Sequence, residues 1–181
     1  MREKKLIDVR MLTEAGIVLA IATILSNIKL FQAPNAGSVT LASMFPLVLF
    51  AIRWGWKKGV FIGAAFGLLS FIIKPEFYHP VQFLLDYILA YGFIGLSGLA
   101  LGKNTGKITA YLPSVLLAHI LRALCHFISG VVFFGMYVPE GTSPVVYSAL
   151  YTLSYMGPET VLSIVFLFLL WRPLSRLLKR Q

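Results

Sequence analysis

Long apolar runs, separated by short polar or basic turns, make up almost the whole chain. A helix of about 20 apolar residues crosses the hydrocarbon of a bilayer, so each long run is read as a transmembrane helix. The pattern predicts an all-α, polytopic membrane protein, a six-transmembrane-helix bundle in which residues 1–181 form a single domain. The expected spans cover roughly residues 11–28 and 38–52, a third run that ends near residue 73, and residues 81–101, 110–136 and 145–171.

Helix-breaking residues mark the turns between these spans. Pro34, Asn35 and Gly37 lie in an expected exterior loop over residues 29–37, and a second polar exterior loop covers residues 137–144. Pro158 lies inside the sixth expected span, where we expect a kink because proline removes a helix hydrogen bond.

The bulk composition excludes a soluble domain. Hydrophobic residues make up 58% of the chain and the mean hydropathy is +0.82, well above the composition of soluble proteins. A net charge of +9 in a soluble protein would indicate nucleic acid as a partner. In a membrane protein it indicates contact with anionic lipid of the inner leaflet. We therefore expect a multi-pass protein of the bacterial plasma membrane, with the lipid bilayer and no nucleic acid among its partners.

The basic residues also indicate the orientation of the chain. All but three of the 16 Lys and Arg residues fall before the first run, after the last run, or in the turns at residues 53–58 and 103–107. Loops rich in Lys and Arg stay in the cytoplasm. The distribution therefore predicts that both termini are cytoplasmic. The three exceptions are Lys29, Lys74 and Arg122.

Signatures of common enzymes and of metal sites are missing from the sequence. There is no His-Glu-x-x-His, no Gly-x-Ser-x-Gly and no P-loop, so the chain has no ATPase of its own. Cys125 is the single cysteine, which excludes an intrachain disulfide and a site built on paired cysteines. The three histidines lack the spacing of metal ligands. We expect a binding protein rather than an enzyme, with no metal and no cofactor.

A few polar side chains in the apolar spans are the candidates for ligand binding. Arg122 and His126 are four residues apart and share one helix face, and Asp86 lies in the outer part of the fourth span. Ionisable groups in hydrocarbon are costly unless they are paired or hydrated, so they mark functional sites. Three tyrosine rings and one threonine hydroxyl in the outer parts of the fourth and sixth spans lie at a similar depth in the membrane: Tyr87, Tyr147, Tyr151 and Thr152. Together these groups predict a pocket in the outer half of the bundle for a small, flat, polar aromatic ligand. In one version of this hypothesis the ligand is a cation.

Structural interpretations of the same residues stay open. Asp86 and Arg122 are equally well read as a structural ion pair, because buried charges are usually paired. Glu159 either belongs to a hydrated region or pairs with Arg122. His126 fits a hydrogen-bonded core histidine, and the tyrosine series fits packing or an interfacial belt.

Small residues form faces on two of the spans. Gly59, Gly63 and Gly67 repeat every fourth residue in the third span, where packing within the bundle is the preferred interpretation. Gly16 and Ala20 have the same spacing in the first span, the best candidate for a face that docks another membrane subunit.

Several segments, in order, resemble the thiamine-specific S components (the ThiT or YuaJ family) of energy-coupling factor transporters. The resemblance covers nearly the whole chain, and its strength lies in the order and spacing of the segments together. The segments are residues 10–14 (RMLTE), 37–46 (GSVTLASMFP), 85–87 (LDY), 126–130 (HFISG), 147–148 (YS) and 155–159 (YMGPE).

The resemblance implies a substrate-capture subunit that binds thiamine from outside for ATP-driven import. It would work with a transmembrane coupling protein and two cytoplasmic ATPase subunits. The resemblance assigns Gly16 and Ala20 to the coupling-protein interface, and implies that the loop between the first two helices covers the ligand. The substrate-binding positions that it implies include Asp86, Tyr87, His126 and Tyr147.

Four positions keep the chemical character of the family pattern but change the residue. Asp86 stands where Glu is expected, Arg122 where Lys is usual, Thr152 where Asn is expected, and Phe134 where Trp is expected. These changes leave open a thiamine-related compound or another vitamin as the ligand, and Arg122 would tolerate a phosphorylated one. A small intramembrane enzyme or a channel is the alternative from a different class.

Overall fold

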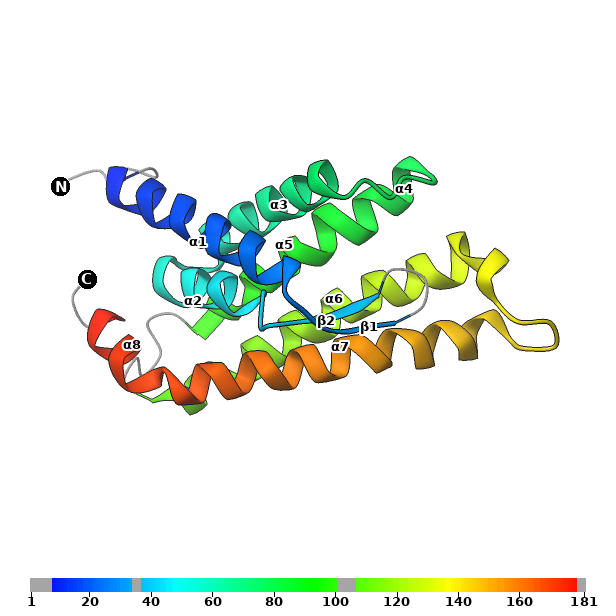
Figure 1. Cartoon of the computed structure of the whole chain (residues 1–181). Helices are drawn as coiled ribbons and strands as arrows, with labels where there is room; N and C mark the ends of the chain where they lie inside the picture. The colour runs from blue at the N-terminus through cyan, green and yellow to red at the C-terminus, as the bar shows by residue number, and fades with distance from the viewer. Residues whose placement is uncertain (1–7, 34–36, 101–106, 179–181) are drawn as a thin grey trace.

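The computed structural model describes residues 8–33, 37–100 and 107–178, and most of these residues are helical (Figure 1). Two elements are strands, and η marks π- and 3₁₀-helical segments. The elements in chain order are α1 (Val9–Asn27), β1 (Lys29–Gln32), β2 (Ser38–Thr40), α2 (Phe45–Trp54), α3 (Trp56–Ile73), α4 (Pro80–Phe83), η1 (Leu84–Leu89), α5 (Ala90–Ile94), η2 (Gly95–Ala100), η3 (Ile108–Ala110), α6 (Leu112–Phe133), η4 (Gly135–Tyr137), α7 (Pro144–Leu169) and α8 (Trp171–Leu178).

Within the described residues, five helices are long and apolar enough to cross a membrane. They are Val9–Asn27, Trp56–Ile73, Pro80–Leu99, Leu112–Phe133 and Pro144–Leu169. α7 passes through Pro158 without ending, so the sixth run predicted from sequence is one continuous helix. The chain is therefore a mostly helical, multi-pass membrane protein.

The expected spanning helix over residues 38–52 is wrong in its outer part. Ser38–Thr40 form strand β2, and the helix that follows, α2, has only 10 residues. A helix of that length is about 15 Å long, half the hydrocarbon thickness. Thr40 and Ser43 direct their hydroxyls to a buried carboxylate instead of to lipid. Pro46 lies in the first turn of α2, where proline favours the start of a helix.

A two-stranded antiparallel hairpin, β1–β2, replaces the loop expected at residues 29–37. Phe31 pairs with Val39 and Gln32 with Ser38. The hairpin lies in front of α6 and alongside α7 in Figure 1, and β2 contacts α7. The hairpin therefore packs on the side of the bundle formed by these two helices.

The fourth span is a composite helix rather than a uniform one. Its middle, η1, is a π-helical segment, and its inner end, η2, is a 3₁₀ helix. π-Helical turns are rare and occur frequently at functional sites, because the extra residue per turn changes the direction of the side chains. Asp86 and Tyr87 lie inside this segment.

Close backbone packing of α3 against the fourth span explains the glycine series of α3. A Cβ on Gly59 would lie 2.9 Å from the carbonyl oxygen of Gly95, and a Cβ on Gly63 or Gly67 would collide with the carbonyl oxygen of Tyr91 or Tyr87. The packing interpretation of this series is confirmed. Gly16 on α1 is different, because nothing lies within 4 Å of a Cβ built there.

We expect Gly63→Ala to lower the free energy of unfolding by about 1–3 kcal/mol, because the new methyl group must push two helix backbones apart. Gly16→Ala is the matched control, since it adds the same methyl group to a helix at an open position. Thermal unfolding of the purified protein in detergent measures both. Equal melting temperatures for the two variants would contradict the packing argument.

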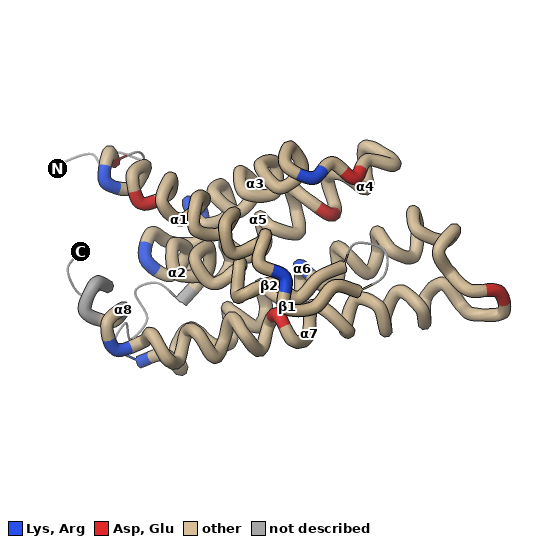
Figure 2. Tube along the Cα trace, viewed as in Figure 1, with Lys and Arg blue, Asp and Glu red and all other residues tan. Residues whose placement is uncertain are grey.

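One end of the molecule holds the start of α1, the α2–α3 turn and α8 (Figure 1), and basic residues gather there (Figure 2). Glu14 joins α1 to α2 at this end. Its carboxylate accepts hydrogen bonds from Arg10 Nε at 3.2 Å and Trp54 Nε1 at 2.8 Å, and lies 2.6 Å from Arg53 Nε. Glu14 thus links the start of α1 to the end of α2.

Candidate functional site

A cavity of about 300 Å³ lies between the hairpin, the outer end of α3, the fourth span, α6 and α7. This volume is at the lower end of the range for small-molecule sites. Every residue predicted from sequence to bind substrate lines it: Asp86, Tyr87, Arg122, His126, Phe134, Tyr147, Tyr151 and Thr152. The convergence of these residues on one cavity is confirmed, whereas their contact with a ligand stays a prediction.

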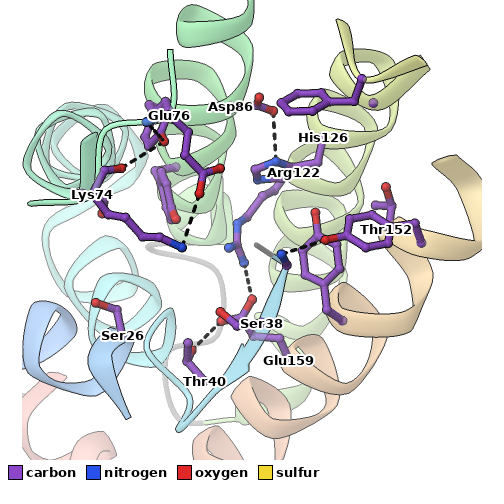
Figure 3. Close-up of a pocket in the computed structure, with 18 of the residues that line it drawn as sticks. Ser26, Ser38, Thr40, Lys74, Glu76, Asp86, Arg122, His126, Thr152 and Glu159 are labelled. Atoms are coloured by element: carbon purple, nitrogen blue, oxygen red, sulfur yellow. Dashed lines mark hydrogen bonds and ion pairs between the residues drawn. The ribbon is translucent and has the colours of Figure 1, made fainter. Parts of the chain in front are cut away.

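Asp86 is held in place by three side chains from two directions. Its Oδ2 accepts hydrogen bonds from Gln82 Nε2 at 2.8 Å and Ser129 Oγ at 2.7 Å. Its Oδ1 lies 3.0 Å from Nδ1 of His126 (Figure 3). The carboxylate is thus fixed at the cavity wall.

His126 lines the cavity and has one ring nitrogen without a partner among the described residues. Nδ1 faces Asp86, while the buried Nε2 has no hydrogen-bond partner in the part of the chain that the structure describes. Buried polar atoms are nearly always satisfied, so an unsatisfied one in a cavity wall indicates a ligand or water partner.

The buried ion pair in the cavity joins Arg122 to Glu159, not to Asp86. Arg122 Nη1 lies 2.8 Å from Glu159 Oε2, and the two side chains are only 5% and 3% exposed (Figure 3). The Asp86–Arg122 pair considered from sequence is therefore wrong, and the alternative pairing of Glu159 is confirmed. The guanidinium also stacks over the ring of Tyr91, with 5.0 Å to the centroid.

The turn before α2 is tied to the same ion pair. Thr40 Oγ1 and Ser43 Oγ donate to Glu159 Oε1 at 2.7 and 3.2 Å. Ala42, between them, adopts a left-handed φ of 53°, which is uncommon for a residue other than glycine. Glu159 therefore connects α6, α7 and the base of the hairpin.

Three tyrosines of α7 form an aromatic wall. Tyr147 and Tyr151 stack with ring centroids 6.1 Å apart, and Tyr155 meets Tyr151 edge-on at 5.4 Å. The backbone N–H of Gly37 donates to the Tyr151 hydroxyl at 2.7 Å, so the tip side of the hairpin is fastened to this wall. A Cβ at Gly37 would lie 2.6 Å from that hydroxyl, which explains why a glycine occupies the position.

Polar and aromatic contacts border the opposite side of the cavity. Lys74 Nζ pairs with Glu76 at 3.3 Å, and the Tyr87 hydroxyl accepts from the backbone N–H of Glu76. Tyr78 and Tyr137 share a hydrogen bond of 3.1 Å between their hydroxyls. That bond is the main cause, with burial second, of a raised pKa of Tyr78, so its hydroxyl stays protonated at neutral pH.

The charges around the cavity leave one acid without a permanent cationic partner. Of the acids in the described lining, Glu159 forms an ion pair with Arg122 and Glu76 with Lys74. For Asp86, the partner that can carry a positive charge is a histidine, His126. The remaining lysine, Lys29, is exposed on β1 and donates to Gln32. The site can therefore receive an aromatic cation or a strong hydrogen-bond donor at Asp86, and it offers no unpaired buried cation to an anion.

Sequence reasoning missed part of the site. Gln82 and Ser129, which hold Asp86, and Thr40 and Ser43, which hold Glu159, were not among the predicted residues. The spacing of Gln82 four residues before Asp86 was an available signal for one of them. Ser129 follows His126 by three residues on α6, so helix spacing was a signal for it as well. Thr40 and Ser43 come from a distant segment, which no local pattern reveals. Among the described residues, no group of three or more His, Cys, Asp or Glu could hold a metal ion.

The two residues assigned to a subunit interface lie elsewhere. Gly16 and Ala20 are exposed on α1 and do not line the cavity. Their role stays a prediction.

Comparison with known proteins gives a consistent result. The family model described as "Thiamine transporter protein (Thia_YuaJ)" matches residues 12–179. The chain is 38% identical to the thiamine transporter ThiT of Bacillus subtilis, over 97% of this chain and 94% of that protein. It is 28% identical to the thiamine transporter ThiT of Lacticaseibacillus paracasei, over 84% and 82% of the two chains. A solved structure of ThiT from Listeria monocytogenes has the same fold, with a TM-score of 0.80, 25% identity, and coverage of 93% of this chain and 97% of that one.

Proposed function

The chain belongs to the thiamine transporter (Thia_YuaJ) family, and on that basis we propose that it is the thiamine-capturing S component of an energy-coupling factor transporter. Its relatives are transporters, so it is a transport protein of the cell membrane and not an enzyme.

The charge balance of the cavity is the observation that supports thiamine best. Thiamine carries a permanent positive charge on its thiazolium ring and an amino group on its pyrimidine ring. Asp86 is the acid whose partner is a histidine rather than a lysine or arginine. Its carboxylate can accept a hydrogen bond from the amino group and offset the charge of the ligand. Tyr147 and Tyr151 offer stacked rings on the α7 side of the cavity, which suit two flat heterocycles.

We assign the remaining contacts by position around the cavity. His126 hydrogen-bonds the ligand through Nε2, and Tyr87 and Phe134 add aromatic surface on the sides opposite α7. Thr152 contributes a hydroxyl. Arg122, already neutralised by Glu159, contacts the ligand as a hydrogen-bond donor and stacking surface rather than as a free charge.

A competition panel tests the proposed ligand. Among the described residues no tryptophan lines the cavity, so intrinsic tryptophan emission is a poor reporter, and Phe134→Trp places one there. We expect thiamine to quench this variant with one-to-one stoichiometry. Thiamine phosphates should bind more weakly because the lining has no unpaired buried cation, the isolated pyrimidine moiety should bind weakly, and riboflavin should not compete. Calorimetry on the unmodified chain should give the same order of ligand affinities without the tryptophan reporter. Riboflavin or another vitamin displacing thiamine at equal concentration would overturn the assignment.

The transport model follows from the absence of an ATPase signature in the sequence and from the exposed small-residue face of α1. We propose that both termini are cytoplasmic and that the hairpin with α2 makes the second of six passages. A coupling protein binds the face of α1 that contains Gly16 and Ala20, and two ATPases drive the cycle. Uptake of thiamine by vesicles that contain this chain alone would favour a channel instead.

We expect Gly16→Leu to separate capture from transport. Position 16 is open, so a leucine fits without disturbing the fold, but it fills the space that a close helix–helix contact needs. Thiamine binding by the purified variant should equal that of the unmodified chain, whereas ATP-dependent uptake should fall by about tenfold or more. Ile17→Leu, which changes an exposed apolar residue without changing its size, is the control. If Gly16→Leu supported uptake at the same rate as the unmodified chain, α1 would not be part of the interface with the coupling protein.

A further inference from the structure

Two buried side chains that were not among the predicted binding residues act on the Asp86 carboxylate. Ser129 of α6 and Gln82 of α4 are each 1% exposed, and both donate to the same oxygen, Oδ2. Within the described residues, the Ser129 hydroxyl makes no other hydrogen bond, and Ser129 is not part of the cavity lining. Any effect of Ser129 on a ligand must therefore pass through Asp86.

Counting acceptor sites shows what this arrangement leaves for a ligand. A carboxylate oxygen accepts about two hydrogen bonds. Oδ2 is filled by Ser129 and Gln82, while Oδ1 has one neighbour, His126 Nδ1. One acceptor position on Oδ1 is therefore left for a ligand, and both Asp86 and His126 line the cavity.

Gln82 also fixes the segment that leads into the fourth span. Its Oε1 accepts from the backbone N–H of Tyr78, and its Nε2 donates to the backbone carbonyl of Glu76 as well as to Asp86. Ser129 approaches from the opposite helix. The two donors thus hold Oδ2 from both sides, which fixes the direction in which Oδ1 points.

We propose that Ser129 and Gln82 are positioning residues that hold Asp86 with one acceptor site of Oδ1 open, and that this makes the site selective for a heteroaromatic ligand with an amino group. The inference rests on the proposed function, and it names the part of thiamine that meets Asp86. The quaternary nitrogen of the thiazolium ring has no N–H, so the amino group of the pyrimidine is the nitrogen donor that thiamine can offer. A site built around such a bond rejects an analogue that lacks the donor, because its buried acceptor is then left unpaired.

The test compares thiamine with oxythiamine, in which a carbonyl oxygen replaces the amino group. For Ser129→Ala we expect thiamine to bind about tenfold more weakly, the value of a hydrogen bond to a charged group, and oxythiamine to change by less than about threefold. The selectivity between the two ligands then falls. Ser114→Ala is the matched control, because Ser114 is another buried serine of α6 that donates to backbone carbonyls away from the cavity.

A double-mutant cycle distinguishes positioning from a general effect on the fold. If Ser129 acts through Asp86, Ser129→Ala added to Asp86→Asn has little further effect on thiamine affinity. Gln82→Met is the second variant and should reduce the same selectivity. Three results would each overturn the inference. In the first, Ser129→Ala loses as much affinity for oxythiamine as for thiamine. In the second, the effects of Ser129→Ala and Asp86→Asn on thiamine affinity add fully, and in the third, Ser129→Ala leaves thiamine affinity unchanged. If the unmodified chain binds no thiamine at all, it is the proposed function that fails.

Discussion

Asp86→Asn is expected to lower thiamine affinity by about 2–5 kcal/mol, which is roughly 30-fold or more, and no substitution at another position should have a larger effect. The change preserves the size of the side chain, so cavity shape is not the cause. It removes the negative charge opposite a cationic ligand. Ser129 and Gln82 both donate, so they hold the amide oxygen, and the amide N–H₂ then faces His126 and the ligand. Two donors meeting there leave the ligand amino group without an acceptor.

Calorimetric titration of Asp86→Asn with thiamine measures this loss. The fold is expected to survive, because the buried pair of Arg122 and Glu159 is untouched, and the melting temperature without ligand is the control. Asp86→Ala should show a loss at least as large. An Asn variant that binds thiamine as tightly as the unmodified chain would exclude Asp86 from the site.

Arg122→Met is expected to have the largest effect on stability, a loss of about 3–5 kcal/mol. Glu159 is buried, and without the guanidinium its charge is left with the hydroxyls of Thr40 and Ser43. Breaking a buried ion pair on one side is costly because the other charge remains desolvated. For a chain of this size the melting temperature should fall by about 10 °C.

Thermal unfolding in detergent checks this result, and two further variants identify its cause. Lys74→Met breaks the exposed pair with Glu76 and should cost no more than about 1 kcal/mol. The double variant Arg122→Met/Glu159→Gln removes both charges and should recover part of the stability. If Arg122→Met and Lys74→Met melted at the same temperature, the ion pair would not be the central support of the site.

Much of the helical framework could be predicted from the sequence. Most outward-facing side chains contact lipid, so the spanning helices appear in the sequence as long apolar runs. Four of the predicted runs correspond closely to α1, α3, α6 and α7. The second run failed because apolar composition over residues 38–52 does not distinguish a spanning helix from a buried strand, turn and short helix. Its Ser and Thr residues were the signal against lipid contact. The π-helical part of the fourth span is invisible to a pattern based on 3.6 residues per turn.

The members of the site could be predicted better than their pairing. Ionisable residues in apolar spans are rare enough to stand out, and Asp86, Arg122 and His126 all reach the cavity. Which acid pairs with Arg122 depends on the relative position of helices that are distant in sequence. Glu159 faces Arg122, 37 residues away, while Asp86 is turned toward His126 and Ser129. Helix periodicity contains no information on that choice.

The most direct test of thiamine capture at Asp86 is a crystal structure of the purified chain with thiamine, in which anomalous scattering locates the thiazolium sulfur. The result that we predict is one thiamine molecule in the cavity, with its amino group within hydrogen-bond distance of Asp86 Oδ1 and its rings beside the tyrosines of α7. Thiamine bound elsewhere, or bound in the cavity with its amino group turned away from Asp86, would contradict the account.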